Sequence, residues 1–423
     1  MDLLVLFGTM VIFFAIGVPI GICLIFPCFL LLLVKPVTSA SFLAQSFYTG
    51  VASSSMIALP FFMICGNIMD KGGISKRLVG AANNCIGGIT GSLGIVTILA
   101  CMLFGAVSGS AVATVAAIGA IMLPEMVRNG YDKYYATGLC ATAGGLGIIV
   151  PPSYPMVIYG VTNNESIGDL FIAGIVPAVL VGGLLMLVNY IYCKKRGIKG
   201  ENKFELKTAL KGFWDAKWAL LMPVIILGGI YSGIFTATEA AATVYGIIIG
   251  CFVYKEVTFK QLWVEFKSTA TFSGGMMWTV APATAIGLIF TYMGVNKAIA
   301  SFFLGISTNT YVVMSLIIII LFFIGMFMQT TPAIVIFSPV LLNVAKSVGV
   351  SSLQFGVVMT IALAVGFCTP PVCANVFVAQ SMTGLPMDKI VKPAIPFIGM
   401  LILALFAVAF VPGLSVGLVQ LLK

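Results

Sequence analysis

The sequence predicts an all-α polytopic membrane protein built from two structural repeats. Its 423 residues are 60% hydrophobic and only 8% charged, whereas soluble globular chains carry about 25% charged residues. Long apolar runs approach or exceed the roughly 20 residues that a spanning helix needs, and they lack the period-two alternation of barrel strands. We therefore expect about ten helical spans with shorter re-entrant segments. The main apolar runs cover residues 3–33, 93–122, 172–192, 277–293, 311–345 and 394–422.

A Gly-to-Pro-Pro element occurs in each half of the chain, inside an apolar run. The first copy is Gly147-Ile-Ile-Val-Pro151-Pro152 and the second is Gly366-Phe-Cys-Thr-Pro370-Pro371. Proline removes a helical N–H donor and glycine permits backbone turns, so both copies predict helices that break within the membrane. Paired breaks of this kind indicate a transport site, and we expect the repeats to be inverted. Chance similarity between Gly- and Pro-rich membrane helices is the alternative.

The predicted order of elements follows from these breaks. Residues 1–192 form the first half, with a helical hairpin near 93–124 and an unwound helix near 147–153. Residues 218–423 form the second half, with a hairpin near 311–345 and an unwound helix near 366–371. The run Leu3–Val34 is expected to be a retained first helix. It lacks the basic start of a secretory signal, and its apolar run is too long for one.

A basic connecting segment, residues 193–217, separates the two halves. The chain has a net charge of +9, and its basic residues cluster in short loops beside apolar helices, which places this segment in the cytoplasm by the positive-inside rule. The same pattern argues against nucleic-acid binding. Apolar residues from Phe204 to Trp218 are spaced so that a helix could lie in the membrane interface, and an ordinary solvated loop is the alternative.

The titratable residues exclude several kinds of chemistry. The chain has no histidine, which rules out a histidine proton relay, a histidine-ligated metal and a Ser-His-Asp triad. The ten cysteines are scattered without metal or redox spacing and are expected to be buried apolar residues. No cofactor and no transition metal are expected. Glu239, near the start of an apolar helix, could either interact with the helix dipole or act as a functional group in the membrane.

The two breaks can bind ions through backbone and neutral side-chain groups. Carbonyl oxygens freed from a helix can coordinate a hard cation such as Na⁺, and free N–H groups at a half-helix N-terminus can hold an anion. Few carboxylates lie in the apolar runs, which favours neutral-oxygen coordination of Na⁺ over a proton relay. Each hydroxyl could instead bond back to its own helix. The polar side chains near the breaks are Ser108, Ser110, Thr114, Ser153, Gln329, Thr330, Thr331, Thr369 and Asn375.

At these motifs the chain resembles the large membrane subunit of tripartite ATP-independent periplasmic (TRAP) transporters. The resemblance covers nearly the whole chain in family order. The matching stretches are Leu59-Pro-Phe-Phe with Gly66, Gly72 and Gly73; Ala106 to Thr114; Gly147 to Ser153 with Tyr159 and Gly160; Phe235 to Ala242; Gly325 to Pro332; and Thr369 to Val372 with Asn375 to Phe377.

The resemblance implies a Na⁺-driven importer of small organic anions in a bacterial inner membrane, working by an elevator movement. Known family substrates are C4-dicarboxylates, sialic acid and other sugar acids. A soluble periplasmic protein would deliver the substrate, and a small four-helix membrane subunit, expected as a separate chain, would complete the complex. The alternatives are an ion-coupled anion transporter without a binding protein and a passive channel; an enzyme finds no support.

The family's two hairpin tips correspond to Ser108–Ser110 and Gly325–Thr331. Two residues depart from the family pattern: Gln329 stands where many members have an acidic residue, and Cys373 stands where many have glycine. We expect Na⁺ to be held by Ser108, Gly109, Gly147, Val150, Gly325, Thr330, Thr331, Gly366 and Thr369, and the substrate by Ser110, Ser153, Gln329, Pro371 and Asn375.

Overall fold

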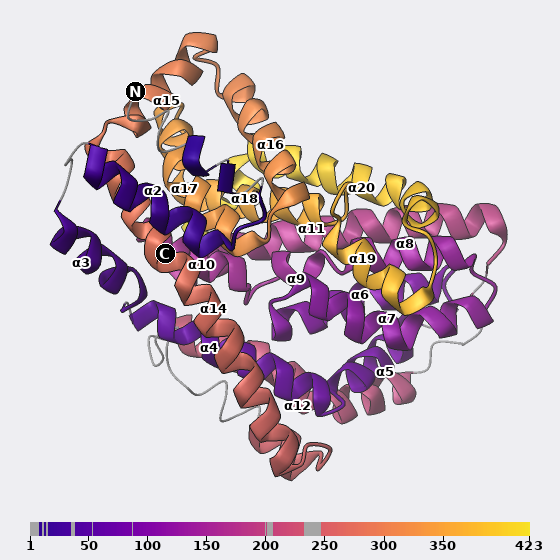
Figure 1. Cartoon of the computed structure of the whole chain (residues 1–423). Coiled ribbons are helices and arrows are strands. Elements are labelled where there is room, and N and C mark those ends of the chain that lie inside the picture. The colour runs from indigo at the N-terminus through magenta and orange to yellow at the C-terminus, as the bar shows by residue number, and fades with distance from the viewer. Residues whose placement is uncertain are drawn as a thin grey trace.

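Every regular element of the computed structural model is helical within the residues that it describes, which are 8–10, 12–13, 16–34, 39–52, 54–86, 88–198, 200, 206–231 and 247–423 (Figure 1). This confirms the predicted all-helical class for that part of the chain. The elements are α2 (Ile20–Val34), α3 (Ala40–Val51), α4 (Ser54–Lys71), α5 (Ile74–Ile86), α6 (Ser92–Ser108), α7 (Ala111–Arg128), α8 (Lys133–Ala143), α9 (Leu146–Ile149), α10 (Tyr154–Asn163), α11 (Ile167–Arg196), α12 (Leu206–Tyr231), the π-helix η1 (Ile248–Val253), α14 (Phe259–Tyr292), α15 (Val295–Ile306), α16 (Thr310–Phe327), α17 (Thr330–Ser347), α18 (Ser352–Phe367), α19 (Ala374–Thr383), α20 (Met387–Phe410), the 3₁₀ turn η2 (Pro412–Leu414) and α21 (Val416–Leu422).

Seven of the described helical segments are long and apolar enough to cross a membrane. That is fewer than the expected ten or so, partly because α6 and α18 are apolar but shorter than the spanning length. The expected first helix, Leu3–Val34, is also interrupted: Gly17 turns with a φ of +80°, and α2 begins only after Pro19. Glycine permits that φ, and proline has no N–H with which to continue a helix. Glu239 lies outside the described residues.

The helices form two packed groups. In Figure 1 the long helix α14 crosses the molecule diagonally, with α2, α3 and α4 against it. The second group contains α6 to α11 and α16 to α21, and it holds both Gly-to-Pro-Pro elements. Helices α5 and α12 pack along each other at the bottom of the view. The connecting segment therefore contributes the end of α11 and the start of a helix that lies against α5, with Leu210 and Trp214 exposed.

Each half contains a hairpin of two antiparallel helices. The first hairpin joins α6 to α7 through Gly109, whose φ is +60°, and Ser110, which caps α7 by accepting a hydrogen bond from the Ala113 backbone N–H at 3.3 Å. The second joins α16 to α17 through Met328 and Gln329. A hydroxyl or amide residue thus precedes the second arm of each hairpin, where the first N–H groups of a helix lack partners.

Each half also contains one interrupted helix. In the first half, α8 and α9 run up to Val150, and α10 starts after Ser153. In the second, α18 ends at Phe367 and α19 starts at Ala374. Both Pro-Pro peptide bonds, 151–152 and 370–371, are cis. The backbone therefore leaves helical geometry at both elements that the sequence singled out.

The two hairpins open toward opposite ends of the helical bundle. We call the end that carries the C-terminus of α11 the basic end and the opposite end the far end. Asn189 on α11 donates to the Gly91 carbonyl at 2.8 Å, which places the open end of the first hairpin at the basic end. Lys346 on α17 lies 3.7 Å from Glu165, just before α11 begins, which places the open end of the second hairpin at the far end.

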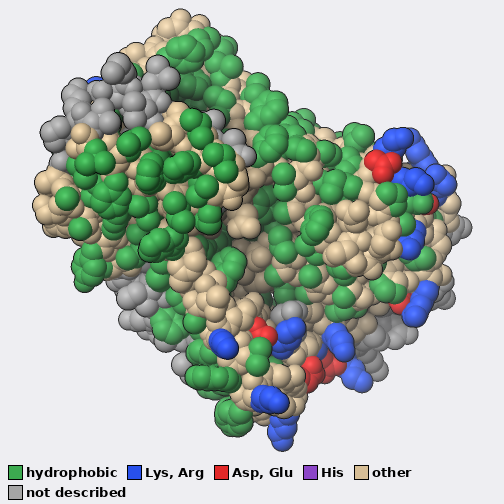
Figure 2. All heavy atoms as spheres, in the orientation of Figure 1, with side chains coloured by type: hydrophobic (Ala, Val, Ile, Leu, Met, Phe, Trp, Pro, Cys, Tyr) green, Lys and Arg blue, Asp and Glu red, His purple; other side chains and the backbone are tan. Residues whose placement is uncertain are grey.

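The surface charge follows the same division. Lys and Arg side chains gather along the lower and right-hand edges of Figure 2, over the region where Figure 1 shows α5, α12 and α8, while hydrophobic side chains cover much of the remaining face. Because basic residues mark cytoplasmic loops, the basic end is the end expected to face the cytoplasm.

Asn189 is a buried polar residue that holds the first hairpin in place. Its side chain is fully buried, donates to Gly91 and accepts a hydrogen bond from the Tyr135 hydroxyl at 3.3 Å. Replacing Asn189 with Leu should destabilise the protein by about 1–3 kcal/mol, because the Gly91 carbonyl and Tyr135 hydroxyl lose a buried partner. Thermal unfolding in detergent measures the effect. Asn343→Leu is the control, because Asn343 is exposed and bonds only to its own helix; an equal loss in both variants would contradict the assigned role.

Candidate transport site

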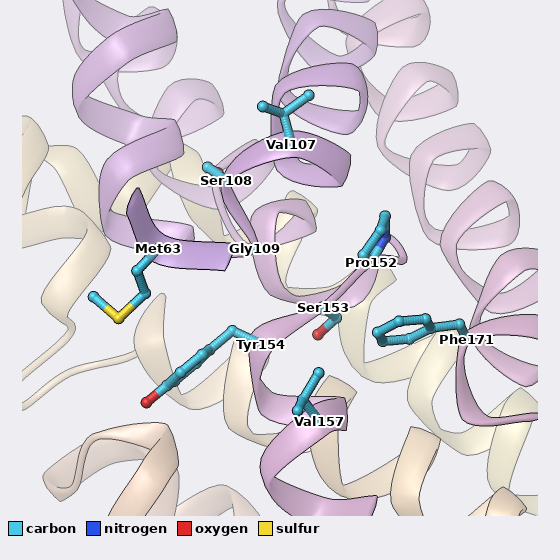
Figure 3. Close-up of a pocket in the computed structure, with 9 residues that line it drawn as sticks. All are labelled: Met63, Val107, Ser108, Gly109, Pro152, Ser153, Tyr154, Val157 and Phe171. Carbon is cyan, nitrogen blue, oxygen red and sulfur yellow. The ribbon is translucent and has the colours of Figure 1, made fainter. Parts of the chain in front are cut away.

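The tip of the first hairpin lies directly against the first helix break. A methyl group placed on Gly109 would lie 3.1 Å from the Tyr154 backbone nitrogen and 3.6 Å from the Pro152 carbonyl oxygen. The two segments meet around a pocket of about 10 Å³, roughly the space of one water molecule. Figure 3 shows Ser108 and Gly109 on one side of the pocket, and Pro152, Ser153 and Tyr154 on the other. Its full lining is Met63, Val107, Ser108, Gly109, Pro152, Ser153, Tyr154, Val157 and Phe171.

Two hydroxyl groups at this contact, those of Thr114 and Ser153, donate their hydrogens to the surrounding backbone. Thr114 donates to the Ser110 carbonyl at 2.7 Å and lies 3.3 Å from the Ser108 hydroxyl. Ser153 donates to the Ile148 carbonyl at 2.5 Å. A hydroxyl has one hydrogen and two lone pairs, so a hydroxyl whose hydrogen is engaged in this way still offers an oxygen to a cation. Back-bonding therefore leaves these groups able to act as ligands.

A pair of glycines brings hairpin and break together in each half. A methyl group on Gly105 would lie 2.7 Å from the Gly147 Cα. In the second half, a methyl group on Gly366 would lie 2.6 Å from the Gly325 Cα. Only glycine allows backbones to approach this closely. Gly105 is therefore the structural counterpart of Gly325.

The second break is more exposed than the first. Pro151, Pro152 and Ser153 are buried, whereas Pro371 is exposed and Val372 has 50% of its surface accessible. Thr369 donates to the Val365 carbonyl at 2.8 Å. Cys373 has a φ of +34°, in the left-handed region that favours glycine. Glycine would adopt this conformation without the steric cost that a side chain brings.

Two side chains connect the halves at the breaks. The Tyr154 hydroxyl, next to the first break, lies 3.0 Å from the Thr331 hydroxyl at the tip of the second hairpin. Asn375, next to the second break, donates to the Ala141 carbonyl on α8 at 3.1 Å. Asn375 is fully buried, and its Oδ1 atom has no hydrogen-bond partner. A buried acceptor without a partner is costly, so this oxygen is well placed to bind a water molecule, an ion or a solute group.

The structure brings some of the predicted residues together and separates others. Ser108, Gly109 and Ser153 line one pocket, and Gly147 lies against Ser110 and Thr114. Gly325 lies against Gly366. Thr330 and Thr331 are both buried at the second tip. Gln329, however, is exposed and its side chain makes no capping hydrogen bond to α17. Val150 leaves helical geometry with a ψ of 126° while its N–H still donates to Leu146.

Acidic side chains contribute little to this region. Within the described part of the chain, no group of three or more His, Cys, Asp or Glu side chains could hold a metal ion. The oxygen atoms at the two breaks therefore come from carbonyls, hydroxyls and amides. Such neutral oxygens suit a weakly bound monovalent cation better than a transition metal.

Sequence reasoning missed two residues of this site, Gly105 and Tyr154. Gly105 precedes the hairpin turn at Ser110 much as Gly325 precedes the turn at Gln329, and that spacing could have identified it. Tyr154 gave no comparable signal, because its partner Thr331 is distant in the sequence.

The close glycine contact in the second half can be tested by adding one methyl group. Gly366→Ala should lower the free energy of unfolding by about 1–3 kcal/mol, because the new methyl group meets the Gly325 backbone, which cannot move aside as a side chain could. Gly399→Ala in α20 is the matched control, because nothing lies within 4 Å of a methyl group there. Thermal unfolding of both variants in detergent provides the measurement. If Gly366→Ala is as stable as the control, the backbones are not in contact.

Comparison with solved structures shows that the fold has a precedent among transporters. The crystal structure of the YdaH transporter from Alcanivorax borkumensis aligns with a TM-score of 0.66 over 90% of this chain and 88% of that one, at 13% identity. At that identity the likeness concerns the fold alone. It supports an all-helical, multi-span membrane protein.

Proteins of similar sequence indicate the family to which the chain belongs. An isethionate TRAP transporter permease protein, DctMQ, of Oleidesulfovibrio alaskensis is 41% identical over 97% of this chain, which spans 65% of that relative's length. The C4-dicarboxylate TRAP transporter large permease protein DctM of Pseudomonas aeruginosa is 37% identical over 86% of each chain. The sialic acid TRAP transporter large permease protein SiaM of Vibrio cholerae is 35% identical over 98% of each.

The family model described as tripartite ATP-independent periplasmic transporter, DctM component, matches residues 7–414. These residues include both hairpins, both interrupted helices and the glycine contacts between them. A chain of this family is a membrane transport component and not an enzyme. The resemblance suggested by the motifs is thus confirmed, and the chain belongs to the DctM family of TRAP transporter permeases.

Proposed function

We propose that this chain is the permease of a Na⁺-coupled importer that takes up a small organic anion. The observation that carries the proposal is the glycine contact that holds a hairpin tip against an interrupted helix in each half, Gly105 with Gly147 and Gly325 with Gly366. Each contact gathers freed carbonyls, free N–H groups and hydroxyls at one place. Two such places supply the ligands for cations and for an anion between them.

Na⁺ would bind at the two junctions of hairpin and break. In the first half its ligands would come from Ser108, Gly109, Gly147 and Val150. In the second half they would come from Gly325, Thr330, Thr331, Gly366 and Thr369. The neutral character of these groups favours Na⁺, because its single charge needs no carboxylate ligand to offset it.

The anion would lie between the junctions, near the N-termini of the half-helices. Ser110 and Gln329 precede α7 and α17, and Ser153 precedes α10. Helix N-termini present free N–H groups and a positive dipole end to an anion. Pro371 is exposed at the second break, and Asn375 contributes the buried Oδ1 that has no partner. C4-dicarboxylates, sialic acid and isethionate, which appear in the names of the relatives, define the substrate class that we propose.

We also propose that the halves are inverted repeats and that transport uses an elevator movement. The opposite directions in which the two hairpins open support inversion. Helices α2, α3 and α4 pack on α14, which also contacts α17 of the group that carries both breaks; we assign the first set to a scaffold and the second group to a moving unit. We place the protein in the bacterial inner membrane with its basic end in the cytoplasm.

Family membership implies a periplasmic binding protein as partner, and we propose that it delivers the anion. A small four-helix membrane subunit would complete the transporter. The expectation that this subunit is a separate chain conflicts with the isethionate relative, whose name, DctMQ, and greater length suggest a fusion. Purifying the transporter from its native membrane would show whether a second, smaller chain accompanies it.

Uptake into proteoliposomes tests the proposed coupling. The complete transporter and its binding protein should accumulate a labelled C4-dicarboxylate, sialic acid or isethionate when an inward Na⁺ gradient is imposed. Each Na⁺ that enters gains about 2.3 kcal/mol per 100 mV of membrane potential. Uptake that continues at full rate with K⁺ in place of Na⁺ would disprove sodium coupling. Equally fast uptake without the binding protein would favour the transporter class that needs none, and non-saturable flux independent of the gradient would favour a channel.

Substitutions of Thr331 and Thr369 test the proposed cation sites most directly. Replacing either with Ala removes one oxygen ligand and should raise the Na⁺ concentration for half-maximal uptake by roughly tenfold, on the scale of one hydrogen bond to a charged group. Thr271→Ala is the control, because Thr271 is exposed and bonds only to its own helix at 3.0 Å. Sodium titration of initial uptake rates measures the effect, and an unchanged Na⁺ dependence would remove the residue from the site.

A further inference from the structure

A cavity of about 620 Å³ lies between the first hairpin and α19, at the basic end of the molecule. It is bounded by the second half of α7, the first turns of α8 and the last residues of α19. Figure 1 shows α19 beside α7 and α8 on the right of the molecule. Its volume falls within the range of small-molecule sites in proteins. The lining residues are Gly119, Ala120, Leu123, Pro124, Val127, Arg128, Lys133, Thr137, Met382 and Thr383.

The cavity combines a cationic rim with apolar walls. Arg128, at the end of α7, and Lys133, at the start of α8, are both exposed, so their charges lie at the ends of these helices. Val127 and Met382 are part of the wall and expose 40% and 37% of their surfaces. A polar rim above an apolar wall fits a molecule that has a charged head and a hydrocarbon body.

The local charge balance is positive. Glu125 lies 3.9 Å from Arg128, which is the outer limit of an ion pair, and both side chains are largely exposed. Lys133 reaches only the Thr383 carbonyl, at 3.4 Å. Lys389 lies 5.9 Å from the ring of Tyr134 and adds a third cation nearby, while the side chain of Asp132 caps α8. The cavity lining itself contains two cations, Arg128 and Lys133, and no carboxylate.

The corresponding interface lies at the far end of the molecule. There α10 packs on α17, and polar contacts follow the interface: Tyr154 with Thr331 at 3.0 Å, Asn163 with Ser338 at 2.7 Å, and Glu165 with Lys346 at 3.7 Å. At the basic end, α19 makes polar contacts with α8: Lys133 with the Thr383 carbonyl at 3.4 Å, beside the cavity, and Asn375 with the Ala141 carbonyl at 3.1 Å. The two interfaces therefore differ: the lysine at the far end is paired with Glu165, whereas the interface at the basic end borders a cavity lined by Arg128 and Lys133.

We propose that this cavity binds an anionic phospholipid of the cytoplasmic leaflet. The phosphate would lie between Arg128 and Lys133, and an acyl chain would lie along Leu123, Val127 and Met382. Basic pockets between membrane helices on the cytoplasmic side suit anionic headgroups. A transported small anion fits less well, because the deeper wall is mainly apolar and would leave a carboxylate without partners. The lipid would occupy the space beside the first hairpin.

Native mass spectrometry of the delipidated, purified transporter with added lipids tests the proposal. Phosphatidylglycerol should be retained more strongly than phosphatidylcholine. The double variant Arg128→Gln/Lys133→Gln should weaken phosphatidylglycerol binding roughly tenfold or more, since each basic residue contributes to the attraction of anionic lipid. The matched control is Lys195→Gln/Arg196→Gln, which also removes one lysine and one arginine charge from the basic end, but outside the cavity. It should change phosphatidylglycerol binding less than twofold.

A second variant fills the cavity without altering any charge. Ala120→Trp should also weaken phosphatidylglycerol binding, because the indole occupies the space of the acyl chain. This variant tests the proposal even if the double variant fails to fold. Equal retention of the two lipids, or equal losses in the double variant and its control, would overturn the proposal. So would succinate binding that is abolished in the double variant while phosphatidylglycerol binding is retained, since the cavity would then hold transported anions. These outcomes do not depend on whether transport is coupled to Na⁺.

Discussion

The architecture depends on one constraint: backbone that leaves helical geometry inside a membrane must find its partners within the protein. Hydrocarbon offers no hydrogen bonds, and each unpaired N–H or C=O group is costly there. At the breaks, Ser153 donates to the Ile148 carbonyl and Thr369 to the Val365 carbonyl. A hairpin also packs against each break at distances that only glycine permits, through Gly105 with Gly147 and Gly325 with Gly366. The close packing also brings oxygen atoms and N–H groups together at two places. Stability and the proposed binding of ions therefore have a common origin.

The two junctions are alike in construction but differ in exposure. Pro152 is buried beneath the first hairpin, whereas Pro371 is open at the second break. The contacts that cross between the halves, Tyr154 with Thr331 and Asn375 with Ala141, connect each break to an element of the other half. The two junctions are therefore joined by direct side-chain contacts. Such a connection is what a transporter needs if cation and substrate are to bind together.

Much of this arrangement could be predicted from the sequence, because its strongest determinants are local. Proline and glycine at the two Pro-Pro elements interrupt a helix whatever surrounds them, and Ser110 favours the start of a helix. Gly17 and Pro19 carry the same local signals, but the long apolar run around them led us to expect one continuous helix. Contacts between distant helices and the exposure of single side chains could not be predicted in this way. The contact of Gly105 with Gly147, the exposure of Gln329 and the bond from Tyr154 to Thr331 depend on which helices meet, and no short stretch of sequence specifies that.

The most direct test of the central claim is backbone hydrogen exchange at the two junctions with and without Na⁺. If the hairpin tips and breaks bind the coupling cation, Na⁺ should slow amide exchange in peptides covering residues 104–112, 147–154, 326–332 and 366–374, relative to the same concentration of K⁺. Peptides from α14, outside the junctions, should exchange equally in both salts. Identical exchange at all four segments in Na⁺ and K⁺ would contradict the account, because the broken backbone would then have no role in holding the ion.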